Sequence, residues 1–592
     1  MTVRDRLAVA ALVILLAVVG VAMFANDAVQ SPEPTPIYIT PAPGLTYREG
    51  VIGHPSSINP LTASTQADRD LVALLFRGLL KAGPDGTLVP DLAASWSVSG
   101  DGLTYTFDLR HDARWEDGQP VTATDVAFTV ALAQDPNYDG PLGASWQGIR
   151  VTVVNAYVVR FTLPTPLGGF ARQALLPILP EHLLGDTDVT DLADSDYSAN
   201  PIGDGPFRII EIDDSNALLV RVSGSAPSTA ASSTGTSSVT SPSAAGSAAA
   251  GTSGSAPGAT ASSVATAGAS VEIPGNVQYV ELVFFADQAS VVKAFQAGTI
   301  DALGGLPPIA ADTVASGGGS HLLLYPFTSM ISVVLNQRSA HPEFGSLNVR
   351  QGLLTAIDRP QILAATLRGR GTIADVPLPS WSSSYDSSAV VAPTYDTAAA
   401  QADLTSAGWA RGASGWTVPP GNSPYAIRLL SPDSTTNPIA FAIAGEVVRD
   451  WQALGLQVSL QAVDATDYGQ DLDNGDFDAA VVDYQLGLDP DVSPLLLSSQ
   501  VAPAGSNLSG VSDKSLDALL MAVRTTSDPT ARQAAISALE KYVSTNVLML
   551  PICFADYEFV VADRVQGVST NEIADPSGRY WDVLDWRLAS DG

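Results

Sequence analysis

Residues 90–128 read PDLAASWSVSGDGLTYTFDLRHDARWEDGQPVTATDVAF. Within this stretch, residues 104–110 alternate between apolar and polar side chains, which predicts a strand with one buried and one solvent-exposed face. Residues 117–120 (Asp-Gly-Gln-Pro) are typical of a turn, because glycine accepts a positive φ and proline fixes its own φ. Thr122, with Asp125 three residues later, indicates a capping box at the start of a helix. The stretch therefore predicts a strand, a turn and a helix, and it contains no catalytic pattern.

The same stretch resembles the signature of the family 5 extracellular solute-binding proteins, the peptide- and nickel-binding components of ABC importers. The family pattern runs roughly PdLAesW, then DGltYtFhLR, then vkWhDGxPvTAxDVvF. Most matching residues are expected to have core or turn roles, so they indicate the fold and leave the ligand open. The matches are Trp96, Tyr105, Phe107, Leu109, Arg110, Trp115, Asp117, Gly118, Pro120, Thr122, Ala123, Asp125, Val126 and Phe128.

Other ordered matches extend the resemblance from Tyr47 to the C-terminus. Residues 57–61 resemble the family's lNPl turn, residues 200–209 resemble its npiGTGPYkl segment, and residues 348–359 resemble its vRqAl..AiDr segment. The resemblance implies an α/β fold of the periplasmic-binding-protein-like type II class. It implies a clamp of two lobes around a cleft, with an extra smaller subdomain and a first domain built from discontinuous pieces.

The length of 592 residues predicts several domains, because single hydrophobic cores stop growing near ~250–300 residues. Residues 222–270 are rich in Ser, Ala, Gly, Thr and Pro without charged or aromatic side chains, which predicts a disordered insert. The predicted parts are an anchor or signal segment (1–25), a proline-rich linker (26–44), lobe I (45–69, 183–310 and 548–592), the smaller subdomain II (70–182) and lobe III (311–547).

Two segments predict local structure outside the signature stretch. Residues 66–80 carry leucines at helical spacing and predict one helix. Residues 425–485 alternate strand and helix patterns, a rhythm that predicts mostly parallel strands with helices on the faces of their sheet.

The N-terminal residues indicate export. An unbroken apolar run at residues 7–25 follows Arg4 and Arg6, and its length is close to the ~20 residues of a membrane-spanning helix. The positive-inside rule places the arginines in the cytoplasm and the rest of the chain outside. The run is longer than the ~7–15 apolar residues of most signal peptides. The segment is therefore predicted to be a single membrane anchor, or a signal that is cut off; both place the folded part outside the cytoplasm.

Composition excludes several classes of function. The formal net charge is −32, which argues against nucleic acid because few cations are present to neutralise phosphates. The single cysteine, Cys553, cannot form a disulfide within the chain and is predicted to be a buried small hydrophobe. Neither an H-E-x-x-H nor a G-x-S-x-G motif occurs. Residues 369–374 fit G-x-G-x-x-A but follow a predicted helix rather than a strand, so no dinucleotide site is predicted. The chain is predicted to be no enzyme and to hold no cofactor or metal.

The ligand-binding candidates come from the resemblance. In peptide-binding relatives, an Asp three residues before a DP or EP pair holds the ammonium group of the peptide. In this chain, alignment on Asp489 and Pro490 puts Leu486 at that position. Either Asp483, earlier in the same segment, is the substitute, or the ligand is not a peptide. For each tryptophan a role in core or surface packing stays open, and for Asp483 a role as a solvated strand end stays open. The candidates are Asp483, Trp381, Trp146, Ser64 and Thr62.

These observations together predict an extracytoplasmic, monomeric substrate-binding protein of an ABC import system. It would capture a small polar solute or short peptide between two lobes and deliver it to a membrane permease. The alternative is a ligand sensor or an envelope-assembly factor on the same fold, outside transport. A secreted hydrolase is the third class considered, and product formation would identify it.

Overall fold

The computed structural model describes residues 43–83, 86–222, 276–413, 415–419 and 423–589. The predicted membrane segment, nearly all of the proline-rich linker and nearly all of the low-complexity tract lie outside these ranges. Within the described ranges, no helix combines the length and the apolar character needed to cross a membrane.

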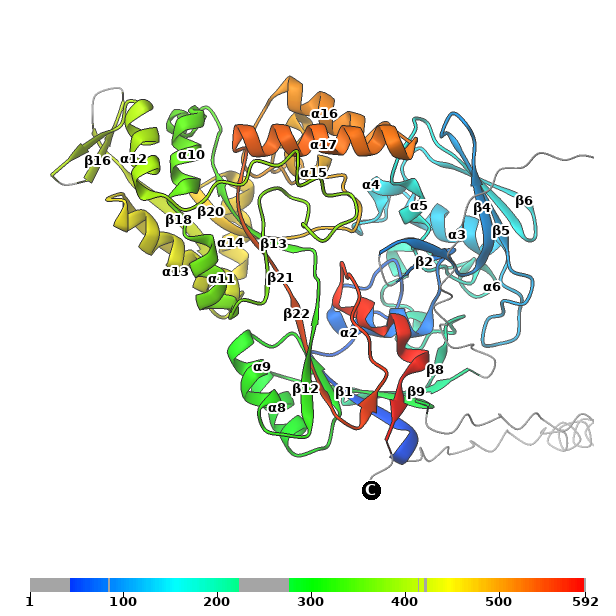
Figure 1. The fold of residues 1–592 in the computed structure, drawn as a ribbon. Helices are drawn as coiled ribbons and strands as arrows, with labels where there is room; N and C mark the ends of the chain where they lie inside the picture. The colour runs from blue at the N-terminus through cyan, green and yellow to red at the C-terminus, as the bar shows by residue number, and fades with distance from the viewer. Residues whose placement is uncertain (1–42, 84–85, 223–275, 414, 420–422, 590–592) are drawn as a thin grey trace, which may run out of the picture. The chain divides into compact units, whose positions relative to one another are not determined.

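The first sheet has seven strands, taken from both ends of the chain and from its middle (Figure 1). They are β1 (Thr46–Ile52), β8 (Phe207–Ile212), β9 (Asn216–Arg221), β10 (Tyr279–Phe285), β11 (Ala302–Gly304), β12 (Ser320–Tyr325) and β22 (Tyr557–Ala562). Their order in space is β12-β22-β11-β1-β10-β9-β8. β1 runs parallel to β10 and β11, and the remaining pairs are antiparallel.

Helices cover the first sheet closely. α8 (Gln288–Gln296) and α9 (Pro308–Ala315) share a hydrophobic cluster with β11 and β22. α8 also approaches β1 so tightly that a Cβ on Gly50 would overlap the side chain of Val291. α2 (Gln66–Leu75) packs against the C-terminal 3-10 helix η5 (Pro576–Asp585). The helix predicted over residues 66–80 is too long. α2 ends at Leu75, the backbone of Phe76 is extended, and a new strand, β2 (Leu80–Ala82), follows.

The second sheet has six strands in the order β14-β21-β13-β20-β18-β19. They are β13 (Ser329–Leu335), β14 (Gly371–Ile373), β18 (Ala426–Pro432), β19 (Gln457–Val463), β20 (Ala479–Gln485) and β21 (Leu550–Ala555). β18 is parallel to both β19 and β20, which confirms the predicted parallel arrangement over residues 425–485. The other pairs are antiparallel. Four helices pack on the core of this sheet: α10 (Leu347–Thr355), α11 (Arg359–Leu367), α12 (Thr397–Ser406) and α13 (Pro438–Ala453).

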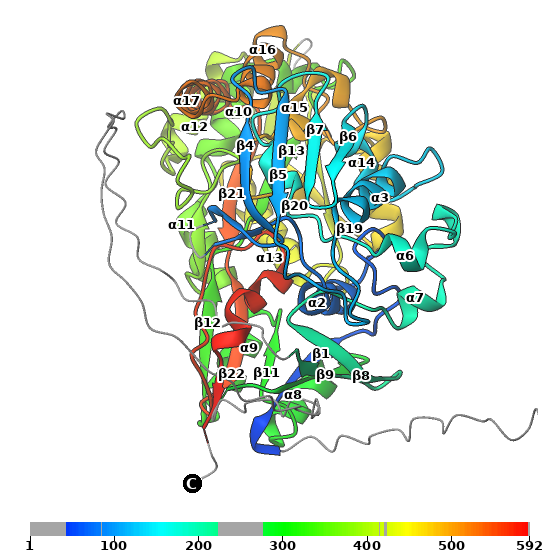
Figure 2. The same cartoon turned by 90° about the vertical axis from the view of Figure 1, so that its right-hand side faces the viewer.

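The third sheet contains the signature stretch. Its four antiparallel strands, in the order β4-β5-β7-β6, are β4 (Ala93–Val98), β5 (Thr104–Leu109), β7 (Val158–Thr162) and β6 (Arg150–Asn155) (Figure 2). The alternation predicted for residues 104–110 is confirmed, because Tyr105, Phe107 and Leu109 are buried. The predicted capping box is present at the start of α3 (Ala123–Ala133), where the Thr122 N–H donates to Asp125 Oδ2 over 2.8 Å.

Shorter elements complete the described chain. The remaining helices are α4 (Gly143–Trp146), α5 (Phe170–Gln173), α6 (Glu181–Leu184), α7 (Asp196–Ala199), α14 (Ala465–Asn474), α15 (Ser493–Leu496), α16 (Lys514–Thr525) and α17 (Pro529–Asn546), with 3-10 turns η1 (Pro43–Leu45), η2 (Val189–Asp191), η3 (Pro342–Gly345) and η4 (Ser498–Gln500). The remaining strands are β3 (Leu88–Pro90), β15 (Ala410–Gly412), β16 (Gly415–Val418), β17 (Ser423–Pro424), β23 (Val565–Gln566) and β24 (Arg587–Leu588).

Two strand-to-strand crossings join the first and second sheets. β12 continues through residues 326–328 into β13, and β21 continues through Asp556 into β22. The two crossings lie beside each other, because β12 pairs with β22 and β13 pairs with β21 (Figure 1). Paired crossing strands of this kind are suited to act as a hinge. The numbered domain boundaries stay a prediction; since β12 belongs to the first sheet, we propose that lobe III begins near residues 326–328.

Glu540 of α17 gives a pH-dependent stability prediction. Its side chain is 4% exposed, and its Oε2 accepts from the Asp386 N–H over 3.1 Å. Burial, with a smaller contribution from the charge of Asp386, raises the pKa of Glu540 from 4.5 to about 7. The ionised form is therefore disfavoured in the folded state, so the contribution of Glu540 to the stability falls as the pH rises from 4.5 through about 7. Glu540→Gln is expected to raise the free energy of unfolding by about 1 kcal/mol near pH 8, and by progressively less as the pH falls toward 4.5.

Urea unfolding at several pH values checks this prediction. Glu211→Gln on β8, where the side chain is exposed, is the control and is expected to change little at any pH. A Glu540→Gln effect of equal size at every pH would contradict the assigned cause.

Candidate functional site

A fixed, exposed carboxylate lies near the carboxyl ends of the parallel strands in the second sheet. Asp483 is exposed near the end of β20, and its Oδ1 accepts from the Ser329 hydroxyl over 2.5 Å. Its Oδ2 accepts from Asn437 Nδ2 over 3.1 Å. Ligands of α/β sheets bind outside the carboxyl ends of the strands, at such positions. The structure therefore brings together three polar side chains from three separate elements at an edge that suits a ligand.

Local structure explains why these partners hold Asp483 in place. Asn437 follows β18 and is the N-cap of α13, where its Oδ1 accepts from the Ala440 N–H over 3.0 Å. That bond orients the amide, so its NH2 group is left to donate to Asp483. Ser329 begins β13, the strand next to β20. Two neutral donors fix the carboxylate without neutralising its charge.

A second carboxylate lies in the same region. Asp556 stands at the crossing between β21 and β22, and burial raises its pKa to about 6 despite a hydrogen bond from the backbone of Gly371. Cys553, three residues earlier, is fully buried, as the sequence predicted. Burial, followed by the charges of Asp483 and Asp556, raises the pKa of the Cys553 thiol to about 12. The thiol therefore stays protonated near neutral pH and is a poor nucleophile.

The segment after β20 is tied to the hinge. The Leu486 N–H donates to the Thr328 carbonyl over 3.2 Å, and the Thr328 hydroxyl donates to the Leu486 carbonyl. The Leu486 side chain packs against the cluster that contains Met330 and Phe554. Gln485 Nε2 donates to the Ala574 carbonyl over 2.9 Å, which links this segment to the C-terminal part of the chain. At the position where the resemblance implies a carboxylate, the chain has an apolar packing residue.

Thr62 and Ser64 lie in the loop that precedes α2. Thr62 Oγ1 is 2.5 Å from Ser57 Oγ, and the Ser64 N–H donates to Asp68 Oδ2 over 3.0 Å. Asp68 and Thr65 form a capping box at the start of α2. The recorded contacts of Thr62 and Ser64 therefore support the loop and the helix start, and a role in ligand binding stays a prediction for both.

The two tryptophan candidates have different surroundings. Trp146 is 2% exposed, and its ring centroid lies 6.0 Å from those of Phe161 and Phe170, inside the aromatic core of the third sheet. This placement favours a packing role. Trp381 is half-buried in the segment between β14 and α12. Among the described residues, the recorded contacts of the Asp483 side chain are with Ser329 and Asn437 and with none of the other four candidates.

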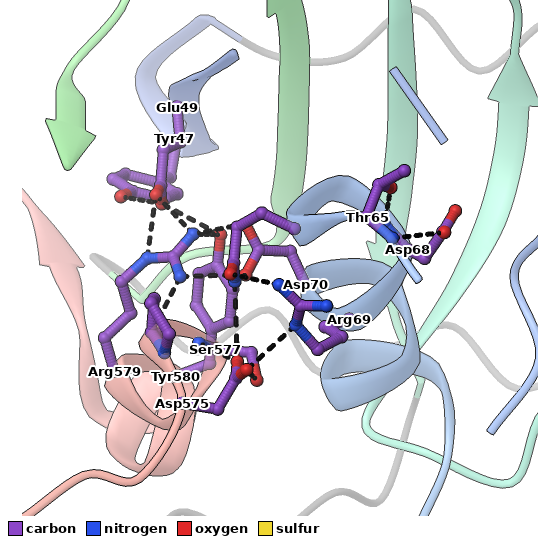
Figure 3. Close-up of polar contacts among 12 residues, drawn as sticks. Tyr47, Glu49, Thr65, Asp68, Arg69, Asp70, Asp575, Ser577, Arg579 and Tyr580 are labelled. Atoms are coloured by element: carbon purple, nitrogen blue, oxygen red, sulfur yellow. Dashed lines mark hydrogen bonds and ion pairs between the residues drawn. The ribbon is translucent and has the colours of Figure 1, made fainter. Parts of the chain in front are cut away.

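A separate charged cluster is buried beside the first sheet (Figure 3). Arg579 of η5 donates from Nε to Glu49 Oε1 over 2.8 Å, and from Nη1 and Nη2 to the carboxylate of Asp70 over 2.8 and 2.6 Å. The Tyr47 hydroxyl donates to Glu49 Oε2 over 2.6 Å, and the Tyr580 hydroxyl donates to the same oxygen over 3.0 Å. Burial raises the pKa of Glu49. The charged side chains are at most 2% exposed, so the cluster joins β1, α2 and η5 and is inaccessible to a ligand.

In the part of the chain that the structure describes, no group of three or more His, Cys, Asp or Glu side chains is arranged to hold a metal ion.

Asn437 and Ser329 were not predicted as site residues. For Asn437 a signal existed, since it directly precedes Pro438 at the predicted start of a helix that follows a parallel strand. For Ser329 the sequence contains no comparable signal.

The comparisons with known proteins agree with this architecture. The model of the bacterial extracellular solute-binding proteins, family 5 Middle, matches residues 87–256 and 268–505, together more than half of the chain. The oligopeptide-binding protein AppA of Bacillus subtilis is 24% identical over 489 residues, which cover 81% of this chain and 80% of AppA.

Solved structures show the same fold. The structure of Bacillus subtilis AppA in complex with a nonapeptide aligns with a TM-score of 0.68 at 21% identity, covering 92% of this chain and 99% of AppA. The structure of NikZ from Campylobacter jejuni in complex with Ni(L-His) aligns with a TM-score of 0.71 at 21% identity, covering 92% of this chain and 100% of NikZ. These neighbours are two-lobed binding proteins of the type II class, as the sequence predicted. The chain belongs to the bacterial extracellular solute-binding proteins, family 5.

Proposed function

We propose that the chain captures a small polar solute or a short peptide at the carboxyl edge of the second sheet, with Asp483 as its anchor. The observation that carries this proposal is the exposed Asp483 carboxylate, held by Ser329 and Asn437 without a cationic partner among its recorded contacts. A carboxylate in this state retains its charge and has lone pairs free to accept from a ligand. The ligand class that suits it carries a protonated amine or another strong hydrogen-bond donor.

The family places this binding step outside the cytoplasm, as the substrate-binding component of an ABC import system. Import is favoured over the alternative of a sensor or envelope-assembly factor. We further propose that residues 7–25 attach the protein to the membrane, that the protein is a monomer, and that it releases its ligand chemically unchanged to a permease. The apolar N-terminal run supports attachment to the membrane, and the binding proteins among its relatives support release of an unchanged ligand.

The ligands bound by relatives do not define a single class of ligand for this chain. The AppA structure contains a nonapeptide and the NikZ structure contains Ni(L-His), two ligands of very different size. Leu486 stands where the resemblance implies an ammonium-binding carboxylate, so the anchor in this chain is displaced toward Asp483. We therefore expect a ligand whose donor group reaches β20 itself rather than the segment that follows it.

A thermal-shift screen of the full-length chain tests the proposal, with a tripeptide, a nonapeptide and Ni(L-His) as probes. At least one probe is expected to raise the unfolding temperature without being converted to a product. Asp483→Asn keeps the shape of the side chain but removes its charge, and it is expected to weaken binding of that probe about tenfold.

Asp473→Asn on α14, where the side chain is exposed, is the matched control and should leave the affinity unchanged. Equal affinity of wild type and Asp483→Asn would remove Asp483 as the anchor. Turnover of a probe would overturn the proposal that the protein performs no chemistry.

A further inference from the structure

The loop before α5 is docked on the turn between α16 and α17. The Gly168 N–H donates to the Arg524 carbonyl over 2.8 Å, a backbone hydrogen bond between these distant segments. The loop is held to the third sheet from its other side, because the Tyr105 hydroxyl donates to the Leu167 carbonyl over 3.3 Å. The contact therefore joins the third sheet to the helix pair α16 and α17, which pack against each other.

Three glycines make this close approach possible. A Cβ on Gly169 would lie 2.5 Å from Asp489 Oδ2. A Cβ on Gly168 would overlap the Thr526 carbonyl, and a Cβ on Gly102 would overlap the Ser527 hydroxyl. At Gly168 the overlap is with backbone, so a larger residue there would hold the two surfaces apart. At Gly102 and Gly169 the overlaps are with the side chains of Ser527 and Asp489, which would have to move. We name the contact of Gly102, Gly168 and Gly169 with residues 524–532 and Asp489 the glycine latch.

An ion cluster lies at the centre of the glycine latch. Arg532 Nη2 donates to Asp489 Oδ1 over 2.7 Å, and Arg172 Nε lies 3.9 Å from Asp489 Oδ2. Arg172 belongs to α5, on the third-sheet side, and its Nη2 also donates to the Gly86 carbonyl over 3.1 Å. The side chains of Asp489 and Arg172 are 21% and 27% exposed, so water and salt reach the contact. Such partly exposed ion pairs contribute modestly and can be broken reversibly.

The two sides of the glycine latch belong to different hydrophobic clusters. One cluster contains buried residues of both the first and the third sheet, including Tyr47, Phe107 and Phe207, so these two sheets form one packed body. The core of the second sheet is a different cluster, and the side chains of α16 and α17 form another. The glycine latch joins these bodies through backbone and polar contacts, at a distance in sequence from the crossings at residues 326–328 and Asp556.

From these observations we propose that the glycine latch is a reversible closing contact, which sets the ratio of closed to open molecules before any ligand binds. A protein whose binding-competent state is only partly populated has an affinity reduced by that fraction. The glycine latch therefore tunes the apparent affinity for every ligand without touching one. This proposal concerns the free protein, so its test needs no ligand and can fail independently of the proposed role of Asp483.

Spin-label distances in the full-length chain test the proposal. Labels at Thr152→Cys on β6 and Ser515→Cys on α16 report on the two sides, since both positions are exposed and the native Cys553 is fully buried. The labelled protein without further substitutions is expected to show a population with short distances, in which the glycine latch is docked. Gly168→Val is expected to shift at least about nine in ten molecules to longer distances, because its added Cβ would overlap the backbone carbonyl of Thr526.

Two further variants keep the test decisive. Gly100→Val is the matched control in the same subdomain, because nothing lies within 4 Å of its added Cβ, and it should leave the distances unchanged. Arg172→Met removes the ion pair with Asp489 without adding bulk. It should shift the distances in the same direction as the glycine-to-valine variant, but by less. High salt should have the same effect on the labelled protein, because it screens the ion pair. Circular dichroism shows whether each variant folds. If the glycine-to-valine variant does not fold, the distances measured in Arg172→Met decide whether the proposal holds. Identical distance distributions in the labelled protein without further substitutions, in Gly168→Val and in Arg172→Met would overturn the proposal.

Discussion

Arg579→Met is expected to lower the free energy of unfolding by about 3–5 kcal/mol, the usual cost of leaving a buried charge without its partner. The Arg579 guanidinium is the shared partner of Glu49 and Asp70, and all three side chains are at most 2% exposed. Without it, two carboxylates face each other away from water. The folded state must then either bear their repulsion or take up protons.

Urea unfolding followed by tryptophan fluorescence measures this loss. Arg110→Met is the control, because the Arg110 side chain is 48% exposed and its ion pair with Asp112 is worth ~1 kcal/mol or less. Adding Glu49→Gln to Arg579→Met is expected to restore part of the stability, because it removes one of the unpaired charges. Equal losses for Arg579→Met and Arg110→Met would mean that the cluster does not stabilise the fold.

Asp68→Ala is expected to lower the free energy of unfolding by about 3 kcal/mol, since several donors lose their acceptor at once. The fully buried Asp68 carboxylate accepts from the backbone N–H groups of Ser56 and Ser57 over 2.6 and 2.9 Å. It also accepts from those of Ser64 and Thr65 over 3.0 and 2.8 Å. One side chain thereby organises the whole loop that enters α2, and each orphaned N–H would cost about 1–3 kcal/mol before water enters.

This loss depends on pH in a defined direction. Burial by itself would raise the pKa of Asp68, but the hydrogen bonds from the backbone of residues 65, 57, 64 and 56 outweigh it, and the pKa falls below 3.8. Because the folded-state pKa is lowered, the stabilisation is complete above pH 3.8 and is lost as the pH falls through the folded-state value. The difference in the free energy of unfolding between wild type and Asp68→Ala should therefore become smaller in acid. Asp214→Ala, at an exposed position, should stay within about 0.5 kcal/mol of wild type at every pH.

The fold was accessible from the sequence because its signals are local. The strand at residues 104–110 and the capping box at Thr122 depend on neighbours within a few residues, and both are confirmed. The predicted helix over residues 66–80 ends five residues too late, since α2 ends at Leu75 and β2 begins at Leu80. The pairing of β2 with β3 is a tertiary contact, which leucine spacing does not contain.

The candidate site was only partly accessible. Asp483 was singled out, but its partners Ser329 and Asn437 are separated from it by 154 and 46 residues. They meet because β13 and β18 are the two neighbours of β20, an order that the sequence pattern does not give. The resemblance made Trp146 a candidate ligand-binding residue, which stays a prediction; its surroundings, the rings of Phe161 and Phe170, favour a packing role. Burial of a tryptophan is decided by the packing of the whole sheet.

The strand order of the first sheet has a consequence for biosynthesis. β1 is made among the first parts of the chain, whereas β22, which separates β12 from β11, is made among the last. Until residues 557–562 emerge from the ribosome, the sheet has a gap one strand wide. Pairing across such a span of sequence is slow, because the chain loses entropy on closing the long loop before the stabilising contacts form. Completion of this sheet is therefore a late event in folding.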